Sequence, residues 1–205
     1  MPDTTLKLQH GKYYHIYNRG INSCNLFNEK DNYEYFIHLY DKNISDVADT
    51  FAWVLMPNHF HFVVRIKKEL ETLGVDPDPD LLKPPHQHFS NLFNAYTKAF
   101  NERFNRHGSL FERPFKRKLV DDEQYLMQLI LYIHNNPVHH GFCSHPVEYP
   151  WSSYVTCISQ KYTKLQRDII IGWFRNVDSF IYQHNQDLNI PEIDQWLELN
   201  SSIET

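Results

Sequence analysis

The clearest pattern of hydrophobic and polar positions lies in residues 51–66. Two runs rich in aromatic and β-branched residues flank Pro57-Asn58, a pair that is typical of turns. The pattern predicts two β-strands joined by a tight turn. Because side chains on a strand alternate between its faces, His59 and His61 share one face, and the phenylalanines between and after them point to the core.

The rest of the chain predicts further strands and helices, separated by turn-forming residues. We expect strands at 12–18 and 115–120, and helices at 28–40, 89–104 and 124–136. The last of these helices should stop before Pro137, because proline disfavours the helical conformation of the residue that precedes it. The proline-rich stretch 74–85 predicts a loop. His86 and His88 repeat the His-x-His spacing, but they open a helix, on which such residues diverge.

This order of elements is that of a split βαβ, or ferredoxin-like, domain followed by a helix. The sequence therefore predicts an α+β fold, an antiparallel sheet with its helices on one face, over residues 10–150. Residues 151–205 predict a C-terminal helical extension, with short helices at 169–175, 180–184 and 193–199. The pattern leaves open whether the two histidines face the covered or the open side of the sheet.

Residues suited to chemistry lie on the predicted strand and on the helix before Pro137. Neutral imidazole is a common ligand for divalent metals, so His59 and His61 offer two donors at a fixed separation. Tyr132 and Asn136 project together, one helical turn apart. A phenol can act as a covalent nucleophile, and a metal ion can polarise a phosphodiester oxygen. Taken alone, these features also fit an amphipathic strand and a packing tyrosine, and Tyr125 on the same flank rivals Tyr132.

Length and composition limit these possibilities. At 205 residues, the chain is long enough for one domain with an appendage. It has no run of about 18 apolar residues and no charged-then-apolar leader, so we expect a soluble cytoplasmic protein without a membrane partner. Cys24, Cys143 and Cys157 are widely spaced and odd in number. This favours reduced thiols over a disulfide framework or a zinc site.

Charge is unevenly distributed along the chain. The formal net charge is −5, yet residues 98–118 carry seven basic side chains against two acidic ones, and residues 176–205 carry six acidic ones without lysine or arginine. Local patches decide where phosphate binds, so the basic stretch is a candidate nucleic-acid surface, although a solvated helix face would look the same. The candidates for phosphate contact are Lys98, Arg103, Arg106, Arg113, Lys116, Arg117 and Lys118.

Three segments carry a resemblance to a known family. They are MPNHFHF at 56–62, the run from 108–111 into 116–121, and YIHNNPV at 132–138 followed by Gly141-Phe142. In this order they resemble the single-tyrosine HUH transposases. The segment YPWSSY at 149–154 resembles the branch of REP-associated tyrosine transposases in particular. The resemblance covers residues 10–155, and the last fifty residues match it loosely.

The resemblance implies a metal-dependent enzyme that cleaves and rejoins single-stranded DNA bearing a REP-like hairpin. His59 and His61 match the metal-binding histidines for Mg²⁺ or Mn²⁺, and Asn136 matches a position where related transposases place a third ligand. Tyr132 matches the nucleophile, whose attack would leave a 5′-phosphotyrosine and a free 3′-hydroxyl. Family members often form homodimers that exchange the tyrosine helix, whereas the branch with longer tails includes monomers, so the oligomeric state stays open.

Two other interpretations also stay open. The same fold could serve a hairpin-DNA-binding protein that has lost its chemistry. An unrelated ferredoxin-like domain with surface histidines would show no effect of metal on DNA binding or cleavage. The cognate DNA sequence, the preferred metal and the role of the acidic C-terminal tail do not follow from the sequence.

Overall fold

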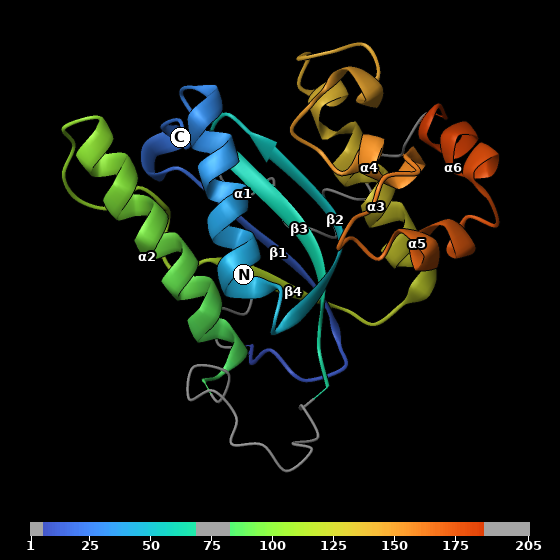
Figure 1. The fold of residues 1–205 in the computed structure, drawn as a ribbon, viewed down its shortest axis with the longest axis horizontal. Coiled ribbons are helices and arrows are strands. Elements are labelled where there is room, and N and C mark those ends of the chain that lie inside the picture. The colour runs from blue at the N-terminus through green and yellow to red at the C-terminus, as the bar shows by residue number, and fades with distance from the viewer. Residues whose placement is uncertain (1–5, 69–82, 187–205) are drawn as a thin grey trace.

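A four-stranded antiparallel sheet forms the centre of the protein (Figure 1). The computed structural model describes residues 6–68 and 83–186. The strands are β1 (Tyr13–Arg19), β2 (Ala48–Met56), β3 (His59–Ile66) and β4 (Lys116–Val120), in the order β2-β3-β1-β4. All neighbouring strands run antiparallel. This is the strand arrangement of a ferredoxin-like domain, so the predicted α+β class is confirmed.

Helices cover both faces of this sheet (Figure 1). They are α1 (Lys30–Ile44), α2 (Pro85–Arg103), α3 (Glu123–His139), α4 (Tyr154–Ile158), α5 (Arg167–Trp173) and α6 (Val177–His184), with 3-10 turns η1 (Ile21–Ser23) and η2 (Pro146–Glu148). As predicted, α1 and α2 share one face. Helix α3 packs on the other face, mainly against β2. The expectation that the helices lie on one face therefore holds for α1 and α2 but not for α3.

Helix α3 can lie between the sheet and the extension because it is buried on most sides. Ten of its 17 residues are buried, more than a single apolar stripe would need. Its N-terminus is capped by Asp122, whose carboxylate accepts a hydrogen bond from the backbone N–H of Tyr125 at 2.7 Å. Among residues 6–68 and 83–186, no helix has the length and apolar character needed to cross a membrane.

The predicted end of α3 before Pro137 is wrong, because the helix continues to His139 with Pro137 inside it. Proline lacks the N–H that would bond to the carbonyl four residues earlier, but the following turn closes with a bond from His140 N–H to Asn136 O at 3.1 Å. Helix α2 begins at Pro85, next to the histidines that were expected to open a helix and four residues before the periodic stretch 89–104, because proline suits the first helical position. The predicted loop before Pro85 lies largely outside the described residues.

Residues 151–186 pack along the free edge of β2 and against α3. Backbone hydrogen bonds join Leu55 N–H to Trp151 O at 2.9 Å and Ser153 N–H to Trp53 O at 3.0 Å. Gln166 N–H donates to the carbonyl of the β2 residue 50 at 2.9 Å. Of the predicted C-terminal helices, 169–175 and 180–184 correspond to α5 and α6, and 193–199 lies outside the described residues. The division into two domains at residue 150 stays a prediction.

Candidate active site

The alternation along β3 divides its side chains between the two faces of the sheet. Phe60 and Phe62 belong to the core cluster beneath α1 and α2. His59 and His61 point to the opposite face, which α3 covers. The histidine pair therefore lies between the sheet and α3, which answers the question that the sequence pattern left open.

His59 lies between two side-chain amides. Its Nε2 is 3.0 Å from Oδ1 of Asn136 on α3, and its Nδ1 is 2.8 Å from Oδ1 of Asn58 in the turn. Burial lowers the pKa of His59 to about 4, so the ring is neutral at neutral pH and carries one proton. The ring can therefore donate a hydrogen bond to only one of the two amide oxygens, and its other nitrogen faces an oxygen without a proton between them. A cation bound by Nε2 and Oδ1 of Asn136 would remove this mismatch, and so would rotation of one amide to present its NH₂ group.

The chemistry of these donors suits a divalent ion. The 3.0 Å between Nε2 of His59 and Oδ1 of Asn136 is an ordinary hydrogen-bond distance, and neutral imidazoles and amide oxygens are ligands that divalent metals accept. Across the described part of the chain, no group of three or more His, Cys, Asp or Glu side chains is arranged to hold a metal. The predicted set instead joins two imidazoles with an amide oxygen, so His59, His61 and Asn136 remain the residues that could hold one.

His61 is almost completely buried beside His59. The two rings meet edge to face with centroids 5.2 Å apart. Nδ1 of His61 is 2.9 Å from Nε2 of His15 on β1, which leaves Nε2 of His61 for a ligand. Burial, together with the nearby charges of other histidines, lowers the pKa of His61 well below its usual value. Both predicted ligands are thus neutral imidazoles, the form that binds metal.

Tyr132 is the tyrosine that lies against these histidines. Its ring packs edge to face on His61 with centroids 5.9 Å apart, and it lies 6.3 Å from the ring of His139. The side chain is 5% exposed. Tyr125 precedes it by seven residues, which corresponds to about 10 Å along the helix axis. The structure therefore brings Tyr132, rather than Tyr125, to the histidine pair.

Three contacting histidines were not identified from the sequence. His15 contacts His61, the ring of His140 lies 5.2 Å from that of His59, and His139 lies beside Tyr132. His15 could have been found from the sequence, because the alternation along β1, which pairs with β3, places it on the same face of the sheet as His61. His139 and His140 follow Pro137, where the helix was predicted to have ended, so no position could be assigned to them.

Strand β4 divides its predicted basic residues between the two faces. Lys116 and Lys118 are paired with β1 residues that share the face of His61. Arg117 points to the other face, where its guanidinium carbon lies 4.9 Å from the ring centre of Phe115. Two of the seven predicted phosphate contacts therefore lie on the same sheet face as the histidine pair.

Other members of the basic stretch lie elsewhere. Lys98 and Arg103 are exposed on α2, which covers the opposite face, and Arg103 forms an ion pair with Glu29 at 2.9 Å. Arg106 donates to the side-chain oxygen of Asn101, in the last turn of α2, and to the backbone oxygen of Ser109 beyond that helix. Arg113 is exposed just before β4. The stretch that is continuous in sequence is therefore divided over more than one surface.

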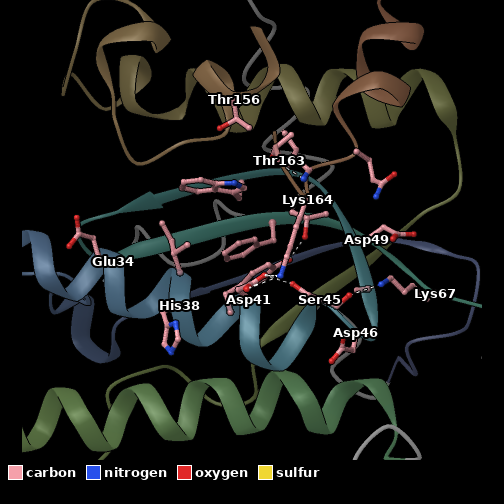
Figure 2. Close-up of a pocket in the computed structure, with 18 residues that line it drawn as sticks. Glu34, His38, Asp41, Ser45, Asp46, Asp49, Lys67, Thr156, Thr163 and Lys164 are labelled. Atoms are coloured by element: carbon pink, nitrogen blue, oxygen red, sulfur yellow. Dashed lines mark hydrogen bonds and ion pairs between the residues drawn. The ribbon is translucent and has the colours of Figure 1, made fainter. Parts of the chain in front are cut away.

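A cavity of about 890 Å³ lies away from these residues, between α1, β2 and residues 156–166 (Figure 2). Lys164 reaches across it to the carboxylate of Asp41 at 2.7 Å. The acidic side chains around it are Glu34, Asp41, Asp46 and Asp49. None of the predicted site residues lines this cavity, and its acidic rim does not suit a phosphate backbone.

Comparison with known proteins supports the fold. No family model and no curated protein matches the chain. A solved structure of a REP-associated tyrosine transposase bound to a REP hairpin matches with a TM-score of 0.61 and 16% identity, over 80% of this chain and 90% of that one. A bacterial tRNA(His) guanylyltransferase (Thg1)-like protein in complex with GTP matches at 0.36 and 8% identity, over 66% and 70%. The first likeness shows a shared fold.

Proposed function

We propose that the protein cleaves and rejoins single-stranded DNA bearing a hairpin, with Tyr132 as the nucleophile. The observation that carries this proposal is the meeting of two elements that are distant in sequence. Helix α3 brings Tyr132 against His61 and Asn136 against His59, while β3 holds both imidazoles on one face. The partner is suggested by the fold neighbour, a REP-associated tyrosine transposase bound to a REP hairpin.

His59, His61 and Asn136 would hold a divalent metal ion, Mg²⁺ or Mn²⁺. When bound, such an ion would polarise a non-bridging oxygen of the scissile phosphate. The meeting of two neutral imidazoles with one amide oxygen supports this assignment.

Tyr132 would attack the phosphorus of the scissile phosphodiester. Its phenolic oxygen forms the new bond to phosphorus and loses its proton, while the bond to the 3′-oxygen breaks and that oxygen gains a proton. The products are a 5′-phosphotyrosine and a free 3′-hydroxyl, and attack by a 3′-hydroxyl rejoins DNA without a nucleotide cofactor. The burial of Tyr132 and His61 would keep water from the phosphotyrosine ester.

Basic residues near the site would contact the DNA backbone. Lys116 and Lys118 share the face of the histidine pair, so they are the proposed contacts for the strand that enters the site. Lys98, Arg103, Arg106, Arg113 and Arg117 would contact parts of a hairpin that extend beyond it. One protomer supplies all the proposed catalytic residues, which is compatible with a monomer and does not require the homodimer considered above.

A hairpin-binding protein without catalysis is the second candidate. The 5% exposure of Tyr132 favours it, because a nucleophile must reach its substrate. Under the first proposal, DNA binding must open a path to the phenol between β3 and α3.

A covalent adduct separates the two candidates. The protein is incubated with a single-stranded hairpin from beside its own gene and Mg²⁺ or Mn²⁺, then run on a denaturing gel with Tyr132→Phe and Tyr125→Phe beside it. We expect the wild type and Tyr125→Phe to form the adduct. We expect no adduct with Tyr132→Phe, and none when EDTA removes the metal. DNA binding without adduct under any condition would favour the binding protein, and adduct that persists in Tyr132→Phe would exclude Tyr132.

A further inference from the structure

His15 on β1 is a fully buried histidine in contact with His61. Its Nε2 lies 2.9 Å from Nδ1 of His61, and the two rings are nearly parallel with centroids 5.1 Å apart. The ring of Tyr17 stacks on His15 at 4.4 Å. His61 therefore has a rigidly held imidazole as its hydrogen-bond partner.

The two histidines that face α3 are held in the same way. Each uses its Nδ1 for a protein contact, His59 with Asn58 at 2.8 Å and His61 with His15 at 2.9 Å. Metal-binding histidines in proteins usually have their second nitrogen bonded in this manner, which fixes both the ring orientation and the position of the proton. Asn58 is adjacent to His59 in sequence, whereas His15 comes from a different strand.

Resting on the proposed function, we propose that His15 is a positioning residue that holds His61 with Nε2 directed to the metal. An imidazole that binds a cation through Nε2 keeps its single proton on Nδ1. His61 would donate that proton in a hydrogen bond to Nε2 of His15, whose own proton then lies on Nδ1. His15 acts through His61 and touches neither the metal nor the DNA.

A purely structural role does not explain an imidazole at this position. Nδ1 of His15 is buried and has no hydrogen-bond partner among the residues that the structure describes. Buried polar atoms without partners are unfavourable, and leucine or phenylalanine would fill the space without one. The polar contact that the ring does make is with His61.

Three variants of the full chain test this role. His15→Leu removes the acceptor for the His61 proton, whereas His15→Gln places an amide oxygen near the same point. His88→Leu is the matched control, because His88 on α2 is also buried with a ring nitrogen that lacks a partner in the described part of the chain. Mn²⁺ affinity is measured by titration calorimetry without DNA, beside the free energy of unfolding.

We expect His15→Leu to weaken Mn²⁺ binding about 10- to 100-fold, His15→Gln to recover most of this loss, and His88→Leu to bind as the wild type does. If His15→Leu binds Mn²⁺ with wild-type affinity, the inference is overturned and the proposed function stands. The same conclusion follows if His88→Leu loses as much Mn²⁺ affinity as His15→Leu. If the wild type binds no Mn²⁺, the proposed function itself fails, and the inference falls with it.

One measurement needs no variant, and it decides the matter if His15→Leu does not fold. Nitrogen NMR of the wild type with Mg²⁺ is expected to find the shared proton on Nδ1 of His61. A proton on Nε2 of His15 would overturn the inference.

Discussion

The two faces of strand β3 are used for different purposes. Phe60 and Phe62 are buried in a cluster of aromatic rings beneath α1 and α2, and Phe60 has neighbours such as Phe36 at 5.4 Å. His59 and His61, which alternate with them, meet polar side chains of α3 and β1. One face therefore contributes mainly apolar burial, and the other holds neutral polar groups in fixed contacts.

This difference shows how eight consecutive residues can serve folding and chemistry at once. Because the strand period is two, a change on one face leaves the side chains of the other in place. The comparison predicts that substitutions on the α1 and α2 face act on stability, and that those on the α3 face act on metal binding, DNA cleavage and the response to pH.

The largest effect on stability is expected for Phe60→Ala. Phe60 is completely buried, and removing such a ring costs about 3 to 5 kcal/mol in lost burial and cavity formation. Chemical denaturation of the variant checks this value. His59→Ala, on the opposite face of the same strand, is expected to cost less than about 1 kcal/mol, because the neutral ring satisfies its two amide neighbours only in part. Equal losses of unfolding free energy in the two variants would contradict the division of roles between the two faces of β3.

The next effect is on pH dependence and comes from a buried hydrogen-bond chain on the α3 face. Nδ1–H of His184 donates to Phe180 O at 2.7 Å, so its Nε2 must accept from Nδ1–H of His134 at 2.9 Å. Nε2 of His134 then accepts from the Ser153 hydroxyl at 2.7 Å. The hydroxyl oxygen accepts from Trp53 N–H at 2.9 Å. At neutral pH each ring therefore carries one proton.

Burial lowers the pKa of His184 from 6.5 to about 4 in the folded protein. The unfolded chain therefore binds the proton more readily, and the stability due to the neutral ring is present above pH 6.5 and declines as the pH falls toward 4. The loss attributable to this one ring is up to about 3 kcal/mol. Unfolding free energies measured between pH 7.5 and 4.5 should fall more steeply for the wild type than for His184→Leu, and parallel curves would contradict this assignment.

The smallest effect is expected from the lysines of β4. Lys116→Gln and Lys118→Gln should each reduce the affinity for hairpin DNA a few-fold, and should lower the slope of log affinity against log salt by about 0.7 to 1. Lys42→Gln, an exposed lysine of α1 on the other face, should change neither. Binding titrations at several salt concentrations test this, and equal effects of all three variants would argue against a DNA path on the α3 face.

Local pattern was sufficient for most elements of the fold. The alternation in residues 51–66 predicted the hairpin and the shared face of the histidines, and helical spacing predicted that Tyr132 and Asn136 lie together. These arguments compare residues within one element, where geometry fixes the spacing. They also gave the order of strands and helices, from which the ferredoxin-like sheet follows.

Contacts between distant elements were not predictable in this way. The contact of His15 with His61 joins residues 46 positions apart, and the hydrogen bond from Trp53 N–H to Ser153 joins residues 100 positions apart. The position of α3 on the second face depends on burial on both sides of that helix, which a single amphipathic stripe does not reveal. The basic stretch 98–118 was continuous in sequence but is divided in space, because strand alternation separates Arg117 from its neighbours.

The most direct test of the central claim is to identify the residue that becomes attached to DNA. The protein is reacted with hairpin DNA and Mn²⁺, digested with protease and nuclease, and its peptides are analysed by mass spectrometry. The proposal predicts a nucleotide linked through a 5′-phosphate to Tyr132, in the peptide that also contains Asn136. A nucleotide on Tyr125 or another residue, or none despite hairpin binding, would contradict it.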